Sequence, residues 1–344
     1  MILFSAILLF GQAPAPPAKL DEPTRQALEK SLGWLAAKQN PDGSWSDGGY
    51  AHNTAITSFA VLAFLSQGHL PGQGKFGEVV ARASRFLVAS SREADGLLVG
   101  ARGGGGRDMY CHGMATLALA QLWGTTADQG IRPALKRAVD LIIRCQNDAG
   151  GWRYAPAPTD ADISVTVMQV MALRAARNAG LHVPDRTMDQ AIAYINKCRD
   201  DKSGGYQYQP GSREPEFART AAGVCVLHLT GKHDAAEVPK ACLLYTSDAA
   251  EVPKAIDYLK KKFDSKNHFY YGHYYASHAM HQVGGKEWDE WYARLKSTLM
   301  PKQSPDGSWS NRDLDGATAG PVYQTAIAVI ALSVPAQFVP IYQR

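Results

Sequence analysis

The sequence lacks any long run of one kind of residue. Its longest basic run is the three lysines from Lys260 to Lys262, and its formal net charge is only +4, from 36 Lys and Arg against 32 Asp and Glu. Charge this low and scattered does not support a nucleic-acid-binding surface. There is also no stretch of about 18 apolar residues, which is the length that a transmembrane helix needs.

Cysteine is scarce as well. The chain has five cysteines in 344 residues, an odd number, and none of them forms a Cys-x-x-Cys pair, so a disulfide framework is excluded.

Hydrophobic residues make up 45% of the chain and charged residues 20%. This composition is typical of globular proteins and excludes disorder throughout the chain. A chain of this length buries a core that needs no covalent staples.

The first 18 residues differ from the rest. Residues 2–10 are largely apolar, and residues 13–18 are rich in proline. The pattern resembles a short signal-peptide core followed by an extended linker, although no basic residue precedes it and a proline follows each candidate cleavage site. We expect an exported or periplasmic protein if this segment acts as a signal, and a cytoplasmic protein otherwise.

Three segments repeat one pattern, in which a Gln is followed four residues later by a Gly and six residues later by a Trp. These copies end at Trp45, Trp152 and Trp309. Repeats of this kind indicate an architecture built from similar units. Weaker copies occur at Asp95-Gly96, at Gly204-Gly205-Tyr206 and, most degraded, at His268-Phe269-Tyr270.

An apolar run with helical periodicity follows each copy, and the six runs begin 50 to 59 residues apart. These runs are apolar almost all round, whereas the helix predicted before each one carries charge on one face. We therefore expect the apolar helices inside and the others outside. The sequence predicts an all-α fold, a single α/α toroid of about six helical hairpins over residues 19–344. The inner helices are expected at 54–65, 113–122, 164–175, 219–229, 274–283 and 324–334.

The repeated Gln, Gly and Trp have structural roles in this scheme. The Gly allows a turn with positive φ. The Gln stands at the end of the outer helix, where backbone carbonyls lack partners, and the Trp folds back to bury its ring over the turn.

These repeats resemble the QW repeats of the squalene cyclase and protein prenyltransferase β-subunit superfamily, over about residues 25 to 335. The resemblance implies an α/α toroid whose central cavity holds an apolar, isoprenoid-like ligand. Squalene cyclases resemble two such barrels joined, with the active site between them, and this chain has room for one. The resemblance therefore implies a second toroid domain or subunit as a partner.

One octapeptide occurs twice. Residues 234–241 are repeated at 248–255, and removing residues 242–255 leaves a continuous reading of the repeat. We interpret residues 242–255 as a duplicated or artefactual insertion in a loop, where insertions cost little.

Polar residues stand where several predicted inner helices begin, so we expect them to line one mouth of the toroid. Apart from two aspartates considered next, the candidates for ligand binding are Tyr110, His112, Arg219, Tyr271, His273, Tyr274 and Tyr323.

Asp160 and Asp162 form the clearest chemical motif. The segment Asp160-Ala161-Asp162-Ile163 resembles the Asp-x-Asp-Asp acid motif of class II terpene cyclases, except that Ile163 replaces the last Asp. The resemblance implies that Asp162 protonates an alkene or epoxide and that Asp160 tunes it, which requires a carboxyl group that stays protonated. The alternative is that Asp162 only caps the helix that follows.

Zinc-dependent prenyl transfer is not expected. The resemblance places the zinc ligands of prenyltransferases at Tyr271, His273 and Gln324, and only His273 can bind zinc. A catalytic zinc has three protein ligands as a rule. We therefore expect no metal and no other cofactor.

Two further features have structural alternatives. The aromatic segment 269–275 suits the stabilisation of carbocations, but Tyr and Phe also replace Trp in a degraded repeat. The four glycines from Gly103 to Gly106, flanked by arginines, suit a phosphate. No strand is expected before them and no Gly-Lys-Ser follows, which favours a rim loop.

The sequence thus favours a toroid that binds, and in one reading cyclises, an apolar isoprenoid-type ligand. Two alternatives remain open at this stage. One is a scaffold that binds a ligand or partner without catalysis. The other is a polysaccharide-acting enzyme, for which Asp160 and Asp162 are the only candidate pair of carboxylates.

Overall fold

The computed structural model describes residues 20–100, 103–212, 214–230, 252–311, 320–336 and 338–342. The expectations for residues 1–18 and for residues 242–251 of the suspected insertion lie outside these residues.

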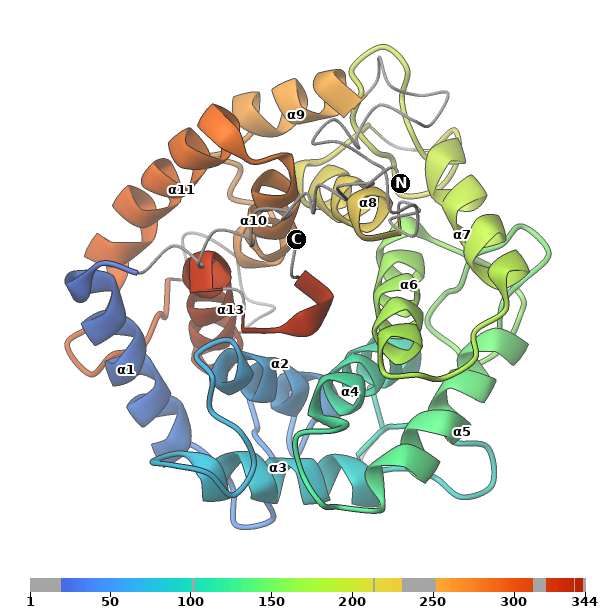
Figure 1. The fold of residues 1–344 in the computed structure, drawn as a ribbon. Coiled ribbons are helices and arrows are strands. Elements are labelled where there is room, and N and C mark those ends of the chain that lie inside the picture. Colours follow the sequence, from blue (N-terminus) through green and yellow to red (C-terminus); the bar gives the residue numbers. More distant parts are fainter. Residues whose placement is uncertain are drawn as a thin grey trace, which may run out of the picture.

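Twelve α-helices in the described residues form two concentric rings (Figure 1). The outer and inner helices alternate along the chain, as the repeat predicts, so the α/α toroid of six hairpins is confirmed. No β-sheet occurs in the described residues, only isolated bridges. The outer ring consists of α1 (Glu22–Ala37), α3 (Gly77–Ala89), α5 (Ile131–Arg144), α7 (Asp185–Lys197), α9 (Val252–Lys261) and α11 (Gly285–Leu299). The inner ring consists of α2 (Thr54–Leu65), α4 (Asp108–Leu122), α6 (Ile163–Asn178), α8 (Phe217–Thr230), α10 (Phe269–Val283) and α13 (Pro321–Ser333).

The two rings differ in which faces they bury. Outer helix α5 buries Ile131, Ala134, Leu135 and Ala138, which lie on one face at helical spacing, and exposes its charged side. Inner helix α6 buries nearly every residue from Ile163 to Ala176. The difference follows from the place of each helix in the rings. An inner helix packs against its two neighbours in the inner ring and against outer helices, and its remaining face points to the centre of the toroid.

The three segments with the Gln, Gly and Trp pattern all fold in the same way. The indole nitrogens of Trp45, Trp152 and Trp309 each donate a hydrogen bond of 2.7–2.9 Å to the carbonyl ten residues earlier, at the end of the preceding outer helix. Each ring is buried. The indole therefore adds a hydrogen bond to the last turn of the outer helix, whereas the sequence interpretation gave the helix-end carbonyls to the Gln. The burial of the Trp ring agrees with that interpretation.

The Gln and Gly of each segment join one repeat to the next. Gln146 Nε2 donates to the carbonyl of Gly150 in its own turn and to that of Thr187 in α7. Gly150 has φ +96°, and a Cβ there would lie 2.2 Å from the Gln190 carbonyl oxygen. Only glycine allows both this turn and this approach to the neighbouring outer helix.

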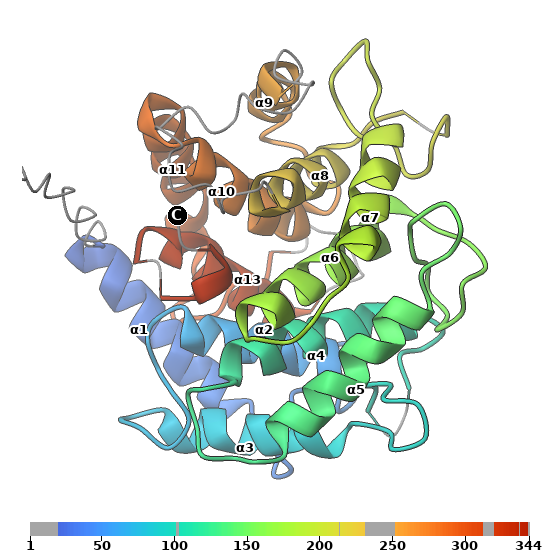
Figure 2. The ribbon, with the colours of Figure 1, turned by 45° about the vertical axis from the view of Figure 1, so that its right-hand side comes forward.

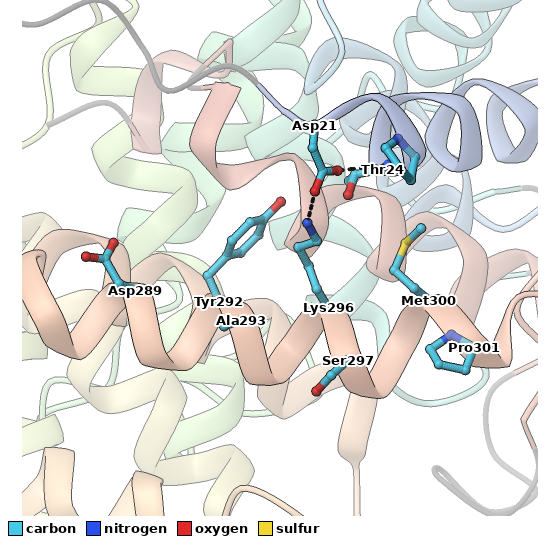
Figure 3. A pocket seen from close by; sticks show the side chains of 10 residues that line it. Asp21, Thr24, Asp289, Tyr292, Ala293, Lys296, Ser297, Met300 and Pro301 are labelled. Atoms are coloured by element: carbon cyan, nitrogen blue, oxygen red, sulfur yellow. Dashed lines mark hydrogen bonds and ion pairs between the residues drawn. The ribbon is translucent and has the colours of Figure 1, made fainter.

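The first and last repeats meet in the same way, which closes the ring. Gln303 Nε2 donates to the Ala27 carbonyl in α1, and Ser31 Oγ donates to the Gly307 carbonyl at 2.6 Å. Figure 3 shows the neighbouring seam between α1 and α11, where Asp21 forms an ion pair with Lys296 beside an open groove of about 580 Å³. These contacts span more than 270 residues of sequence.

The last described residues cross the interior of the ring (Figures 1 and 2). After α13 the chain forms two short 3₁₀ helices, η3 (Val334–Ala336) and η4 (Pro340–Tyr342). The Ile341 amide donates to Gln121 Oε1 near the end of α4, and Phe338 lies against Gly68 just after α2. This C-terminal segment therefore lies at the mouth formed by the C-terminal ends of the inner helices.

No helix in the described part of the chain combines the length and the apolar character needed to cross a bilayer.

Candidate functional site

A cavity of about 390 Å³ opens at the opposite mouth, where all six inner helices begin. We call this the N-terminal mouth. Residues from the first two turns of the inner helices and from the loops before them line the cavity. They are Asp47, Tyr50, Asn53, Ala55, Ile56, Phe59, Gly104, Arg107, Tyr110, Cys111, Met114, Tyr154, Ser164, Met168, Tyr208, Glu216, Ala218, Arg219, His268, Tyr271, Gly320 and Tyr323.

The cavity wall changes character along the helices. Phe59, Met114 and Met168 lie one to two turns inside α2, α4 and α6, and give an apolar lining. Tyrosine hydroxyls and the Arg107 and Arg219 guanidinium groups come from the loops and first helical turns nearer the rim. This arrangement suits a ligand with a large apolar part and a polar end.

Asp162 is the N-cap residue of α6, so it does cap the helix that follows it. Its Oδ1 accepts a hydrogen bond of 3.0 Å from the Val165 amide. The side chain is fully buried. Oδ2 has no hydrogen bond of ordinary geometry within the described residues, and Arg153 Nε lies 3.9 Å from it.

Burial raises the pKa of Asp162, although the Val165 amide, the Tyr208 hydroxyl and Arg153 each act to lower it. A carboxyl group taken out of water favours its neutral form. The helix cap is therefore also a carboxyl group biased towards protonation. Asp162 does not itself line the cavity, but Tyr208 and Ser164 beside it do.

Asp160 has the opposite environment. Its side chain is half exposed and forms an ion pair with Arg153. Although partial burial opposes it, hydrogen bonds from the Ala161 amide and from Arg153 hold the pKa of Asp160 below its usual value. The pKa values of the two carboxyl groups thus shift in opposite directions, so that Asp160 favours the ionised form and Asp162 the neutral form. This is the arrangement expected of an acid and its charged neighbour.

Four predicted binding residues, Tyr110, Arg219, Tyr271 and Tyr323, line the cavity. The Tyr110 ring stacks on Tyr154 with centroids 6.0 Å apart, and Tyr323 meets Phe59 edge-on at 5.2 Å. The Tyr271 hydroxyl is buried without a hydrogen-bond partner among the described residues.

Arg219 lies over a tyrosine at the rim. Its guanidinium carbon is 5.2 Å from the centroid of Tyr208, and it forms an ion pair of 3.1 Å with Glu216.

The other three predicted binding residues lie away from the cavity. His112 is buried between α4 and α5, where Nδ1 accepts from the Leu98 amide and Nε2 donates to the Ala138 carbonyl. His273 donates from Nε2 to the Phe263 carbonyl, inside a cluster of aromatic rings. Tyr274 packs behind Phe59 at 5.6 Å. For the two histidines the reason is helix geometry, because residues two apart, such as Tyr110 and His112, point about 200° apart.

Tyr154 and Tyr208 are lining residues that sequence reasoning did not identify. Each stands two residues after the aromatic residue of its repeat, Trp152 and Tyr206, and Asp47 has the same place after Trp45. Aligning the repeats on their aromatic residues would have found this shared position.

The glycine run forms part of the rim. Gly104 and Arg107 line the cavity, and the Gly104 amide donates to Asp108 Oδ1 at 2.8 Å. The rim-loop interpretation therefore accounts for it. Across the described ranges, no three His, Cys, Asp or Glu side chains stand close enough to hold a metal ion.

Comparison with protein families gives a match over almost the whole chain. Residues 17–177 and 160–339 each match the prenyltransferase alpha-alpha toroid domain. Among curated proteins, drimenyl diphosphate synthase of Streptomyces showdoensis is 28% identical over 224 residues, which are 63% of this chain and 40% of that protein. The enzyme of the same name from Streptantibioticus cattleyicolor is 28% identical over 136 residues, 38% of this chain and 24% of that protein. The chain thus spans less than half the length of these relatives.

Solved structures share the fold across enzymes with different chemistry. The type II terpene cyclase MstE from Scytonema superposes with a TM-score of 0.62 at 13% identity, over 92% of this chain and 98% of that one. An α-1,6-mannanase from Salegentibacter sp. HEL1_6 gives 0.66 at 9% identity, over 92% and 99%. The cellobiose 2-epimerase of Spirochaeta thermophila gives 0.65 at 12% identity, over 93% and 99%. At such low identities the similarity establishes the fold alone.

Proposed function

Since this chain belongs to the prenyltransferase alpha-alpha toroid family, we propose that its cavity binds an isoprenoid-type apolar ligand and that Asp162 is the acid that starts cyclisation of that ligand. The observation that carries the proposal is the contrast between the two neighbouring carboxyl groups. Burial raises the pKa of Asp162, and hydrogen bonds hold that of Asp160 down.

The chemistry requires an acid that remains protonated near neutral pH in a site with little water. A proton delivered to an alkene carbon leaves a cation on the neighbouring carbon, and later ring closures move that positive charge along the ligand. Aromatic faces stabilise such a charge, and the cavity offers Phe59 with the rings of Tyr110, Tyr271 and Tyr323. Apolar Met114 and Met168 suit the hydrocarbon part of the ligand.

The relatives support the same reading. Both curated relatives are drimenyl diphosphate synthases, and one solved structure of the neighbouring cyclase holds geranylgeranyl dihydroxybenzoate as its substrate. Because this chain spans 40% of the longer-matched relative, we propose that a second domain or subunit completes the enclosure of the ligand.

The carbohydrate alternative finds less support in the site. A glycosidase needs two carboxyl groups that face the same bond across a cleft. Asp160 lies in an ion pair with Arg153 and does not line the cavity, and Asp162 is buried behind the lining. The remaining candidates among the lining residues are Asp47, held by the Tyr323 amide, and Glu216, held by Arg219.

The proposal is tested by incubating the protein with squalene and with prenyl diphosphates of increasing length, and by analysing products by mass spectrometry. We expect a cyclic product from the wild type and a rate at least 100-fold lower from Asp162→Asn, which keeps the shape and the helix cap but has no carboxyl proton. Asp160→Asn should lose less. Full activity of Asp162→Asn would reject the acid role. A wild type that neither converts nor binds any of these ligands would favour the non-catalytic scaffold.

A further inference from the structure

Tyr208 lies beside Asp162 and lines the cavity. The segment that contains Tyr208 and Gln209 forms hydrogen bonds with residues 161–163 of the aspartate motif. The Ile163 amide donates to the Tyr208 carbonyl at 3.0 Å, and Gln209 Nε2 donates to the Ala161 carbonyl at 2.7 Å. These bonds fix Tyr208 beside the first residue of α6. Its ring lines the cavity, whereas Asp162 does not.

The Tyr208 side chain is also held in place. Two guanidinium groups lie near its ring, Arg153 at 5.8 Å and Arg219 at 5.2 Å from the ring centroid. Its hydroxyl forms a hydrogen bond with the Tyr154 hydroxyl, and Tyr154 lines the cavity as well. The hydroxyl also interacts with the Asp162 carboxyl group. A phenol placed in this way lies next to the acid and also lines the cavity.

Only one oxygen of Asp162 remains for such a contact. Oδ1 is occupied by the Val165 amide, and Oδ2 has no ordinary hydrogen bond. We propose that Tyr208 couples Asp162 to the cavity, so that the proton of Asp162 reaches a ligand through the Tyr208 hydroxyl. This inference rests on the proposed function, and it adds a residue that sequence reasoning did not identify.

The proton transfer balances without any further reactant. The Tyr208 O–H proton moves to an alkene carbon of the ligand, which forms a C–H bond from the π electron pair and leaves a cation on the adjacent carbon. The carboxyl proton of Asp162 replaces it on the phenol oxygen. Tyr208 stays neutral and Asp162 becomes a carboxylate. The proton lost when the final cation is quenched passes to solvent, and solvent reprotonates Asp162.

Few other charges surround Asp162. Arg153 and Asp160 lie in the same loop and are ionised near neutral pH. The remaining titratable neighbours have raised pKa values, chiefly because they are buried, and stay neutral there. They are Tyr110 of α4, Tyr194 of α7, Cys198 just after α7 and Tyr271 of α10. A change in the pKa of Asp162 after substitution of Tyr208 can therefore be assigned to the lost hydroxyl.

The first measurement needs no substrate. Carboxyl ¹³C NMR titration of protein labelled at aspartate, with the Asp162 signal assigned by its loss in Asp162→Asn, gives the pKa of Asp162. In Tyr208→Phe we expect this pKa to rise by about one unit, because the carboxylate loses a hydrogen-bond donor. Tyr154→Phe, which keeps the Tyr208 hydroxyl, is the matched control and should change it by much less. Both variants keep their rings, and thermal melting verifies that they fold.

An unchanged pKa in Tyr208→Phe, or an equal rise in both variants, would overturn the coupling of Tyr208 to Asp162.

The second measurement uses an isoprenoid that the wild type converts. There Tyr208→Phe should lower kcat by about 100-fold with KM nearly unchanged. A shifted pKa with normal kcat would reject the transfer of the proton through Tyr208. If no isoprenoid is converted by the wild type, the proposed function fails, and with it the transfer to a ligand, while the titration still decides whether Tyr208 is coupled to Asp162.

Discussion

The Asp47 carboxylate accepts a hydrogen bond of 2.7 Å from the backbone amide of Tyr323, a residue 276 positions away in the chain. Helix α13 has no capping side chain of its own, because its N-cap residue is Gly320. Asp47 therefore supplies the missing cap from the first repeat. A Cβ at position 320 would lie 1.8 Å from Asp47 Oδ1, so the glycine is required for this contact.

Asp47→Ala should lower the free energy of unfolding by about 1–2 kcal/mol, as the loss of a helix cap does. Asp47→Asn should lower it by less, since Asn also accepts from a backbone amide. Urea denaturation at pH 7 measures both, with Asp148→Ala at an exposed position as the control. If Asp47→Ala is as stable as the control, the contact does not contribute to closing the ring.

Trp152→Ala should destabilise the protein by roughly 3–5 kcal/mol, because a large buried ring and its hydrogen bond to the Ile142 carbonyl are both lost. Trp152→Phe keeps a ring and should cost less. Trp34→Ala, at a half-buried tryptophan on outer helix α1, is the matched control. Equal melting temperatures for the two alanine variants would contradict the structural role of the repeated tryptophan.

Substitution of Asp162 by Asn should destabilise the protein less than substitution by Ala. Asp162→Asn keeps an acceptor for the Val165 amide, so we expect a stability within about 0.5 kcal/mol of the wild type, whereas Asp162→Ala should lose about 1 kcal/mol. Chemical denaturation at pH 7 distinguishes the two. Equal losses would show that the cap is not what Asp162 contributes to stability.

Stability should fall below neutral pH because two buried histidines must stay neutral. Burial lowers the pKa of His112 to about 4 and that of His273 to about 3. Between these values and 6.5 the unfolded chain binds more protons, so stability is complete above pH 6.5 and is lost as the pH falls. Each histidine should account for about 2 kcal/mol between pH 7 and pH 5.

His112→Gln isolates one of these contributions, because Gln does not titrate and can both donate and accept. Denaturation of the variant at pH 7 and pH 5 should show a smaller pH dependence than the wild type. The same slope in both proteins would mean that His112 is not kept neutral by the fold.

We also expect the purified protein to bind no stoichiometric zinc. The positions of the prenyltransferase ligands hold Tyr271, His273 and Gln324, and His273 uses Nε2 to bind the Phe263 carbonyl. Treatment with EDTA should leave the melting temperature unchanged, and elemental analysis should find no metal. One zinc ion per chain would reject this prediction.

The fold could be predicted because its signal is repeated six times. The expected inner helix 54–65 agrees with α2 to the residue, whereas α4 begins at Asp108, five residues before the expected start. Its first turn carries polar residues that face the cavity, and these interrupt the apolar pattern.

The site could be predicted only in part, because position along a helix does not determine the face on which a residue lies. Tyr110 and Tyr271 line the cavity, but His112 and His273, each two residues later, face the outer ring. The raised pKa of Asp162 follows from burial by neighbouring elements, which no local motif encodes. The position of Tyr208 beside Asp162 depends on a contact between two repeats, the hydrogen bond from the Ile163 amide to the Tyr208 carbonyl.

The C-terminal segment, which lies at the mouth opposite the cavity, has a consequence for biosynthesis. Because Ile341 binds Gln121 and α13 packs against α1 and α2, residues of the sixth repeat complete the core of the first repeats. Domains whose contacts are local fold while they are being translated. Here the apolar faces of α1 and α2 have no permanent cover until α13 has been translated, so nascent chains and chains truncated before α13 should be the forms that chaperones bind and that aggregate.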